Sequence, residues 1–480
     1  MLGRALLLAN SGLVTTPVVP NLPVQPAIIQ TSDGTNAGPS YYYRNYCVDP
    51  KTNTYLWMYG SGSTYPKVAW INTTSGVGYG YTYLTQTASS GTAYQVGTAA
   101  RGLNGGVWNG QFTVSHNHYY PSDGSTTRYR TRILTFNPYP ESGIPTDALI
   151  SVKESSSSYY RTIDSMLRDE KTGDYYIVCN GSPYTYVAKM DANWNEQWSY
   201  RLSNKAGARL AFGKISKDLY VATYTSTIKV SLYRITRSGT IVSKKTTAYS
   251  TFNNGNLPDL VIDPTETYAY IQIKTGTTNT AAPYYDYIRI FRFPTSGSES
   301  VKIAISSPVT PGTTYRVNAG GLAFQEDDPN ALIVHAVRDD NVINYIYTLN
   351  TSTMTWYTTS RRRSFTYSTG GIHTDPRGNI IGALNRSSTT LWNGTLIANT
   401  NNLDSGIWTT VVSGGSLYQS VGGYSTFTPS AYTTQTQTLI DDTDTTIAEP
   451  SYLNSFVDYP LSSFNRLYTA SPSGLVYQSY

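Results

Sequence analysis

Two histidines, His116 and His118, are the residues in this sequence whose spacing best suits a metal site. They occur in the stretch SHNHYY. Residues at i and i+2 of a strand share one face, where two imidazoles could bind zinc. The chain holds only 4 histidines, however, and Asp123 is the sole acidic residue nearby. Because a third ligand is lacking close by, we predict that this pair belongs to a sheet and binds no metal.

Three short clusters of charged residues raise other possibilities. Two acidic clusters could offer oxygen ligands to calcium, but neither has the glycine and the distal glutamate of an EF-hand loop, so we interpret both as solvated turns. One basic cluster could meet phosphates or an acidic partner, and we interpret it as an exposed loop with surface contact as a hypothesis. The two acidic clusters are Asp441, Asp442 and Asp444, and Glu326, Asp327 and Asp328. The basic cluster is Arg361, Arg362 and Arg363.

No motif of a known catalytic type stands out. The sequence has no GxSxG elbow, no HExxH pair and no glycine-rich phosphate loop, which would indicate a serine hydrolase, a zinc protease or a nucleotide-binding enzyme. A glycosidase carboxylate pair stays open, because a sequence does not give the separation of two carboxylates in space. We predict no catalytic residue, no cofactor and a protein that is not an enzyme.

The composition points to strands and turns. Of 480 residues, 13% are aromatic, 14% are charged and 44 are tyrosines, and this excess of Tyr with Thr, Ser and Gly favours strands over helices. The net charge of +5 neither requires nor excludes a nucleic-acid partner. Tyrosine supplies large contact area at low entropic cost, so its runs either form contact surfaces or merely fill strands. The runs that we propose as contacts are Tyr41, Tyr42 and Tyr43, and Tyr119 and Tyr120.

One sequence motif, which we call the repeated motif, recurs along the chain. It is a polar and mostly acidic turn followed by a run in which apolar or aromatic residues alternate with polar ones. Its two clearest copies are MLRDEKTGDYYIVCNGS, from Met166, and LVIDPTETYAYIQIKTG, from Leu260. Intervals between copies of roughly 46 to 65 residues fall around the period of a propeller blade. The seven copies that we identify are anchored near residues 49, 111, 169, 217, 263, 328 and 375.

The segments between copies of the repeated motif predict hairpins. YTYVAKMDANWNEQWSYRL, from Tyr184, reads as a strand, a tight polar turn and a second strand. A meander of three or four such strands cannot bury both faces alone, and radial packing into a β-propeller solves this, whereas a β-solenoid needs shorter repeats. We predict an all-β propeller of about seven blades, within a range of six to eight, over residues 41–400. Its equivalent turns are expected at Asp49, Asp169, Asp263 and Asp375.

The pattern of VAKMDANWNEQWSYRL, from Val187, resembles the repeat of quinoprotein-type propellers. The resemblance implies a fold and no activity, because propellers host unrelated functions. Quinone-dependent dehydrogenases of that kind usually carry a signal peptide and a calcium site, and we identify neither in the sequence.

The two ends differ from the repeats. Residues 1–40 hold five prolines between Pro17 and Pro39 and predict an extended anchoring arm, whose spaced apolar residues can contact a neighbouring subunit. Residues 401–480 predict a β-rich C-terminal extension that closes the ring or adds a blade. The assembly contacts that we predict in the arm are Leu6, Leu7, Leu8, Val18, Val19, Leu22, Ile28 and Ile29.

In composition and architecture the chain resembles bacteriophage virion proteins, more narrowly propeller-bearing tail components such as nozzle, tip or fibre-base subunits. The resemblance implies a structural subunit anchored by its arm among other tail proteins in a symmetric assembly. The apolar run Ala5–Ala9 is short for a signal peptide, and no run approaches the ~18 residues of a membrane span. We therefore expect a virion location after assembly in the host cytoplasm, with nucleic acid met only through a tail channel.

Two other functions remain as alternatives. The first is a host-glycan receptor-binding protein or a polysaccharide depolymerase, in which exposed aromatic residues would bind sugar. The second is a secreted enzyme of the quinoprotein type, which would require a bound quinone and calcium.

Overall fold

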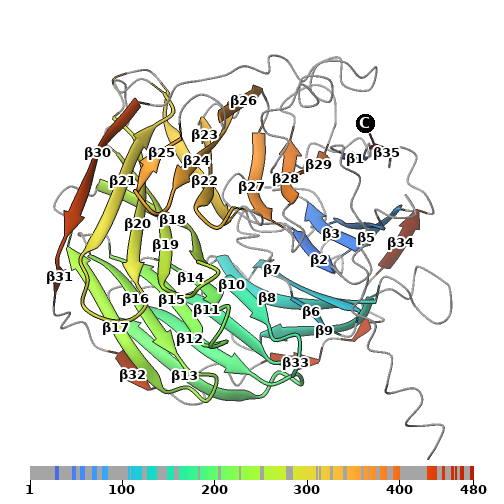
Figure 1. The fold of residues 1–480 in the computed structure, drawn as a ribbon. Helices are drawn as coiled ribbons and strands as arrows, with labels where there is room; N and C mark the ends of the chain where they lie inside the picture. The colour runs from blue at the N-terminus through green and yellow to red at the C-terminus, as the bar shows by residue number, and fades with distance from the viewer. Residues whose placement is uncertain are drawn as a thin grey trace, which may run out of the picture.

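Seven sheets follow one another around a ring, and each has five strands (Figure 1). All pairings between neighbouring strands are antiparallel, and the described residues contain no α-helix. The prediction of an all-β propeller of about seven blades is confirmed. The computed structural model describes residues 27–31, 46–49, 54–59, 67–72, 78–84, 106–108, 110–121, 127–137, 149–155, 162–181, 184–203, 207–225, 229–248, 253–276, 285–309, 312, 315–324, 328–338, 343–357, 362–366, 368–374, 379–385, 393–399, 430–440, 446–448, 456–458, 460–461, 465–469 and 476–479.

Blades are numbered here in chain order. Blades 1 to 4 are built from β2 (Tyr46–Asp49), β3 (Thr54–Tyr59), β4 (Lys67–Asn72) and β5 (Gly78–Leu84); β6 (Gly106–Trp108), β7 (Gln111–Pro121), β8 (Thr127–Phe136) and β9 (Leu149–Ser155); β10 (Thr162–Arg168), β11 (Tyr175–Gly181), β12 (Tyr184–Met190) and β13 (Glu196–Ser203); and β14 (Gly207–Phe212), β15 (Leu219–Tyr224), β16 (Lys229–Ile235) and β17 (Ile241–Ala248). Blades 5 to 7 are built from β18 (Asn253–Ile262), β19 (Tyr268–Gly276), β20 (Tyr287–Pro294) and β21 (Val301–Ser307); β22 (Val317–Phe324), β23 (Ala331–Arg338), β24 (Ile343–Asn350), β25 (Thr355–Trp356) and β26 (Arg362–Thr366); and β27 (Ser368–Thr374), β28 (Asn379–Asn385) and β29 (Asn393–Asn399).

Every copy of the repeated motif lies in the same place, at the connection between the first and second strands of a blade. The aspartate has a local reason, since its carboxylate accepts hydrogen bonds from backbone N–H groups of the turn. Asp263 accepts from Thr267 and Tyr268 at 2.9 and 2.8 Å, and Asp169 accepts from Lys171 at 2.9 Å. The predicted equivalence holds for Asp169 and Asp263; Asp49 is the last residue of β2, and Asp375 lies outside the described residues.

The apolar core lies between the blades. One strand, β20, supplies alternate residues to two cores because successive side chains of a strand point to opposite faces. Ile288 and Ile290 pack with residues of blade 6, whereas Phe291 and Phe293 pack with residues of blade 4. The first strands of consecutive blades contact one another from β2 through β6, β10, β14, β18 and β22 to β27. Blades 2 to 6 are thus each in contact with a neighbour on both faces.

Strand β1 (Ala27–Thr31) completes blade 7. It pairs with β29, where Ile28 lies opposite Leu396, and its other edge pairs with a C-terminal strand. This corrects the predicted arm of residues 1–40 for this stretch, because Ile28 and Ile29 belong to a sheet of the ring. Proline at positions 23 and 26 precedes the strand, and the backbone can donate to both neighbours only where proline is absent.

The described residues of the predicted C-terminal extension form neither an eighth blade nor a single closing strand. Its strands run around the outside of the ring in the reverse of the blade order, and each adds a fifth strand to one blade (Figure 1). We call these strands the belt. They are β30 (Ser430–Gln437) on blade 5, β31 (Leu439–Ile440) on blade 4, β32 (Thr446–Ala448) on blade 3, β33 (Phe456–Asp458) on blade 2, β34 (Asn465–Thr469) on blade 1 and β35 (Val476–Ser479) on blade 7.

We predict that removal of residues 1–31 lowers the melting temperature of the isolated protein by several degrees. The truncation takes away β1, so β29 and β35 both lose their backbone partner. Removal of residues 1–22 keeps β1 and serves as the control, for which we expect an unchanged melting temperature. Equal melting of the two truncated proteins would contradict this role of β1.

Candidate functional site

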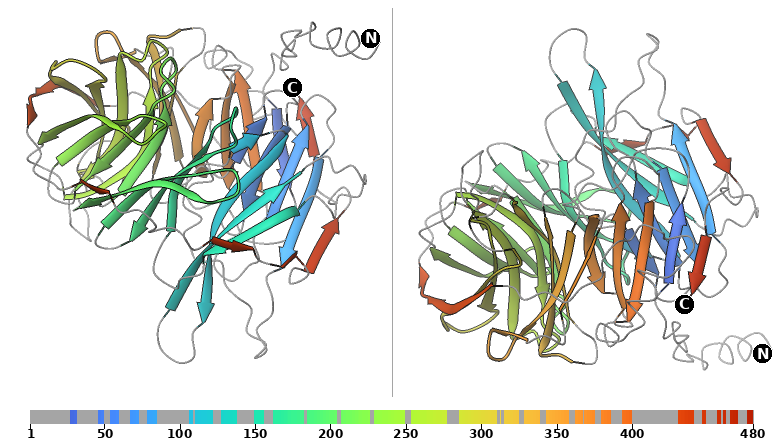
Figure 2. Two further views of the ribbon diagram at one scale, coloured as in Figure 1. Left: turned by 90° about the horizontal axis from the view of Figure 1, so that it is seen from below. Right: turned by 90° about the horizontal axis from the view of Figure 1, so that it is seen from above.

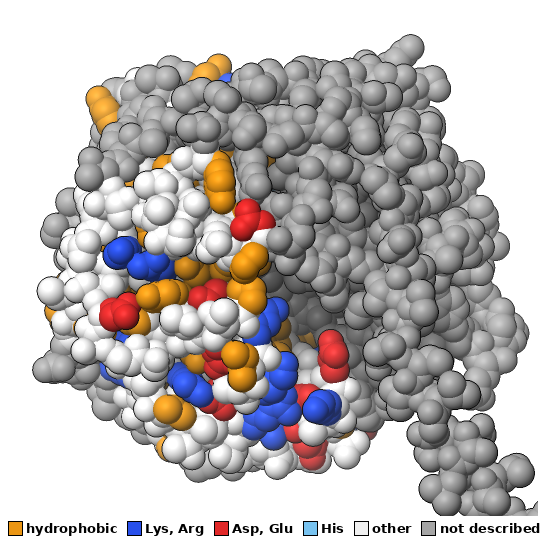
Figure 3. All heavy atoms as spheres, in the orientation of Figure 1, with side chains coloured by type: hydrophobic (Ala, Val, Ile, Leu, Met, Phe, Trp, Pro, Cys, Tyr) orange, Lys and Arg blue, Asp and Glu red, His pale blue; other side chains and the backbone are white. Residues whose placement is uncertain are grey.

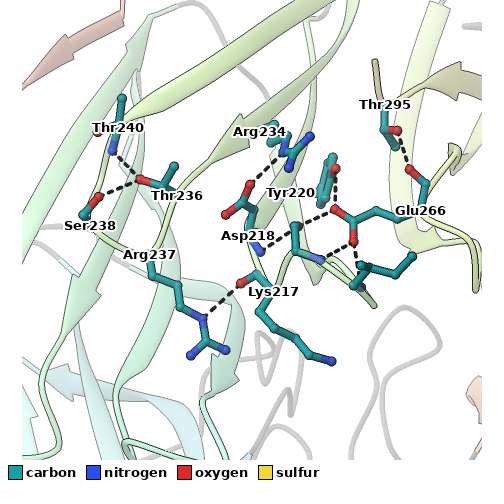
Figure 4. A network of polar contacts seen from close by, with 12 residues as sticks. Lys217, Asp218, Tyr220, Arg234, Thr236, Arg237, Ser238, Thr240, Glu266 and Thr295 are labelled. Atoms are coloured by element: carbon teal, nitrogen blue, oxygen red, sulfur yellow. Dashed lines mark hydrogen bonds and ion pairs between the residues drawn. The ribbon is translucent and has the colours of Figure 1, made fainter.

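The joint between blades 4 and 5 holds the best-connected group of polar side chains in the described residues (Figure 4). It lies at the end of the ring where the turns between strands 1 and 2 and between strands 3 and 4 gather. Its centre is Glu266, in the turn between β18 and β19, which reaches the loop 213–218 between β14 and β15 of the preceding blade. We call this loop the joint loop.

The Glu266 carboxylate accepts hydrogen bonds from four groups of blade 4. The backbone N–H groups of Ile215 and Ser216 each donate to Oε2 at 2.8 Å. The Tyr220 hydroxyl donates to Oε1 at 2.9 Å, and the Ser216 hydroxyl donates to the same oxygen. One side chain of blade 5 thus replaces the water that the joint loop would otherwise bind.

The charge states at the joint are fixed by these bonds. Burial opposes the charge of Glu266, but the hydrogen bonds from blade 4 outweigh it and hold the pKa of its carboxyl below the ordinary value. Burial, and then the Glu266 carboxylate, raises the pKa of Tyr220. Near neutral pH the glutamate is therefore ionised and the tyrosine protonated, so neither group is poised for acid–base chemistry. The arrangement serves to hold the loop.

The joint loop is also held from its own blade. Arg234 donates to Asp218 at 2.7 Å, and Arg237 donates to the carbonyl of Lys217 at 3.2 Å. A Cβ at position 213 would lie 2.6 Å from both Glu266 Oε1 and Ser216 Oγ, so a larger residue than glycine there would displace these two side chains. The loop is therefore fixed on two sides before any partner binds.

The fixed loop presents an apolar and a basic side chain to solvent. Ile215 is 70% exposed, and its neighbour Lys214 is exposed as well. Partial desolvation, and then the charge of Lys217, lowers the pKa of Lys214. Figure 3 shows basic side chains near the hollow at the centre of this view of the ring. Both side chains stand on a loop whose backbone is already held, so little loop ordering would oppose the binding of a partner there.

A second joint, between blades 3 and 4, contains the tryptophan of the quinoprotein-like pattern. Trp198 donates from Nε1 to the carbonyl of Arg237 at 3.2 Å, and Tyr200 donates to the carbonyl of Gly239 at 2.5 Å. Gly239 has φ of 98°, and a Cβ there would lie 2.8 Å from the Trp198 ring. Asp169 pairs with Arg237 at 2.6 Å. Trp198 therefore ties adjacent blades.

The structure separates the residues that the sequence singled out. His116, His118, Tyr119 and Tyr120 lie on β7, Arg362 and Arg363 on β26, and Ile28 and Ile29 on β1. His335 is fully buried, and Asp328 lies in a turn where it accepts from the Asn330 N–H. Outside the described residues are Leu6, Leu7, Leu8, Val18, Val19, Leu22, Tyr41, Tyr42, Tyr43, Arg361, Glu326, Asp327, Asp441, Asp442 and Asp444.

Sequence reasoning missed Glu266, Tyr220, Arg234 and Arg237. The one feature of the sequence that could have pointed to this site is the position of Glu266 inside a copy of the repeated motif. Where the structure describes the chain, it holds no group of three or more His, Cys, Asp or Glu residues that could bind a metal. Nor do those residues include a helix long and apolar enough to cross a membrane.

We predict that Glu266→Gln lowers the free energy of unfolding by about 1–2 kcal/mol at pH 7, because an ionised acceptor is lost. The folded pKa is lowered, so this stabilisation is present above the unfolded value of 4.5 and is lost as pH falls through the folded pKa. Chemical denaturation at pH 7 and at pH 3 measures it, and the difference between wild type and variant should shrink at pH 3. Glu170→Gln, at an exposed turn of blade 3, is the matched control. A constant difference across pH would refute the assignment.

Comparisons with known proteins add little. No family model and no curated protein matches the chain. A solved structure described as "Structure of Dos1 propeller" is similar over 77% of this chain and 94% of that chain, with 10% sequence identity and a TM-score of 0.41. At that level of similarity it supports no inference about what this chain does, and the fold is established by the seven sheets themselves.

Proposed function

We propose that this chain is a non-enzymatic structural subunit of a bacteriophage tail, in which the propeller is a rigid module that meets other proteins. The single observation that carries the proposal is the belt, which adds an outer strand to six of the seven blades. Blade 6, within the described residues, instead has β25 and β26 one after the other along the outer edge of β24.

The belt changes what the outside of the ring offers to other molecules. In each of six blades the fourth strand would be an edge with unpaired N–H and C=O groups, which invite pairing with other chains. The belt strand pairs with that edge, as β30 does along β21 and β34 along β5. In a particle that packs many copies together, such protection supports contact through loops and discourages contact through edges.

The belt also links the blades around the circumference. A blade that leaned away from the ring would have to break its pairing with a strand that continues onto the next blade. Because blades 5, 4, 3, 2, 1 and 7 are joined in this way, the ring gains resistance to opening beyond the apolar packing between blades. Such resistance to opening would suit a subunit of a phage tail, which must keep its shape under mechanical load.

The composition supports the same proposal. The chain is rich in Ser, Thr, Tyr and Gly and only 14% charged, which suits a β-rich protein whose surfaces are largely covered by neighbours. The charged groups at the two described joints bind turns of the adjacent blade. Glu266 accepts a hydrogen bond from the joint loop, and Arg237 forms an ion pair with Asp169. On this proposal the exposed joint loop is one of the places where a neighbouring subunit is met.

We expect phage particles released from cells that carry this gene to contain the chain, with antibody against it labelling the tail in electron micrographs. The tail is expected because a ring with protected edges suits a stacked, load-bearing structure. A capsid protein of the same particle serves as the marker for the head. Absence of the chain from purified particles would contradict the proposal, and so would conversion of host polysaccharide by the purified protein.

Removal of residues 430–480 should leave a folded ring that self-associates. The truncation exposes the fourth strands of the blades that the belt covers, and exposed edges pair with one another. Light scattering coupled to gel filtration, over a range of concentrations, measures the association. A protein without the belt that stays monomeric at the concentrations where the full chain does would show that the belt does not protect edges.

A further inference from the structure

A buried lysine connects blade 5 with blade 6. Lys274 lies on β19, and its Nζ is 3.3 Å from Asp286 Oδ2 and donates a hydrogen bond to Asn318 Oδ1 at 3.1 Å. Asp286 immediately precedes β20 of blade 5, whereas Asn318 belongs to β22, the first strand of blade 6. The two blades, coloured yellow-green to orange in Figure 2, lie side by side, and β19 contacts β22.

The three side chains are enclosed by the two blades. The Lys274 side chain is 12% exposed and the Asp286 side chain 3%, and Asn318 is 6% exposed. Ile288 lies opposite Lys274 in the strand register, and Val317 precedes Asn318; both are fully buried. Water therefore has little access to the amine and the amide, so it competes poorly with them in any reaction between the two.

Asp286 is fixed beside the lysine from two sides. Its Oδ2, the oxygen that faces Lys274, also accepts the backbone N–H of Val317 at 3.1 Å. A Cβ at Gly276 would collide with Asp286 Oδ1, so glycine leaves the space that this carboxylate fills. One carboxylate oxygen is thus in contact with the amine and with the backbone next to the amide of Asn318.

We propose that Lys274 and Asn318 form an isopeptide bond, which joins blades 5 and 6 covalently. Asp286 accepts one proton from the Lys274 ammonium, and the neutral Nζ attacks Cγ of Asn318. The bond between Nζ and Cγ forms, and the bond between Cγ and the amide nitrogen breaks. Two protons pass from Nζ to the leaving nitrogen, one of them by way of Asp286, so that ammonium departs and Asp286 ends ionised as it began. No oxidant, cofactor or other reactant is consumed.

The geometry supports this reaction over a plain ion pair. Reacting atoms must be about 3–3.5 Å apart, and the carbon under attack is bonded directly to the oxygen that lies 3.1 Å from Nζ. Two strands and the residue before a third hold the groups together, so the encounter costs little entropy. The released ammonium diffuses away, which makes the reverse reaction ineffective.

The bond would act where the belt does not. Among the described residues, blade 6 takes no belt strand, and a covalent link to blade 5 would tie it to the belted part of the ring. The inference goes beyond the proposed tail role and does not depend on it. Because the reaction happens once in each chain, it adds no enzymatic activity.

The test is mass spectrometry of the full chain, both intact and after digestion with trypsin. The isopeptide bond lowers the intact mass by one ammonia and removes the cleavage site at Lys274. Because trypsin cuts after lysine and arginine, segments 246–289 and 317–338 should then appear as one branched peptide. Lys274→Arg keeps the positive charge but has no primary amine, so this variant should show its full sequence mass and no branched peptide.

Two further variants separate the carboxylate from general packing. Asp286→Asn removes the proton acceptor and should yield no branched peptide. Asp259→Asn is the matched control, because Asp259 is also a buried aspartate of blade 5 and accepts the backbone N–H of Leu322 in blade 6 at 2.7 Å. This control should retain the branched peptide.

The mass of the wild-type chain decides the matter whether or not a variant folds. Wild-type protein that is cleaved after Lys274 into separate linear peptides, at its full sequence mass, would overturn the proposal. So would loss of water with a link from Lys274 to Asp286. A branched peptide in Asp286→Asn at the wild-type level would refute the part assigned to Asp286.

Discussion

Burial of both faces of every blade is the constraint on which this structure depends. A β-meander with apolar residues on both faces, as in β20, leaves one face in water unless a neighbour covers it. A row of blades would always have two uncovered faces at its ends, and only a closed ring has none. Strand β1 helps to close the ring, because it precedes blade 1 in the chain and pairs into the sheet of blade 7.

Apolar packing alone does not fix the ends of the blades, where the chain turns and backbone groups lack strand partners. There the blades exchange polar contacts, and several of them join a side chain of one blade to the backbone of the adjacent blade. Glu266 receives the N–H groups of the joint loop, and Trp198 donates to the carbonyl of Arg237. These bonds add directional contacts between adjacent blades to the close packing of their apolar faces.

The sequence was informative wherever a local physical rule acts. The turn aspartates repeat because each holds its own turn, so Asp169 and Asp263 could be matched from the sequence alone. It was silent where pairing is distant and short. β31 has only two residues, Leu439 and Ile440, too few for any periodicity, and β1 sits among prolines that suggest an arm. Glu266 was missed for the same reason, since its partners are 46 to 51 residues away.

The path of the belt also bears on the order in which the molecule forms. Each belt strand pairs with the outer edge of a blade that precedes it in the sequence, so that edge must exist before the strand can dock. Belt strands as short as β31 and β32, with two and three residues, hold too few hydrogen bonds to form alone. Contacts between β1 and β35 join the two ends of the chain, and such distant contacts form late because closing long loops is entropically unfavourable. We therefore expect the blades to form first, and the pairing of β1 with β35 in blade 7 to form last.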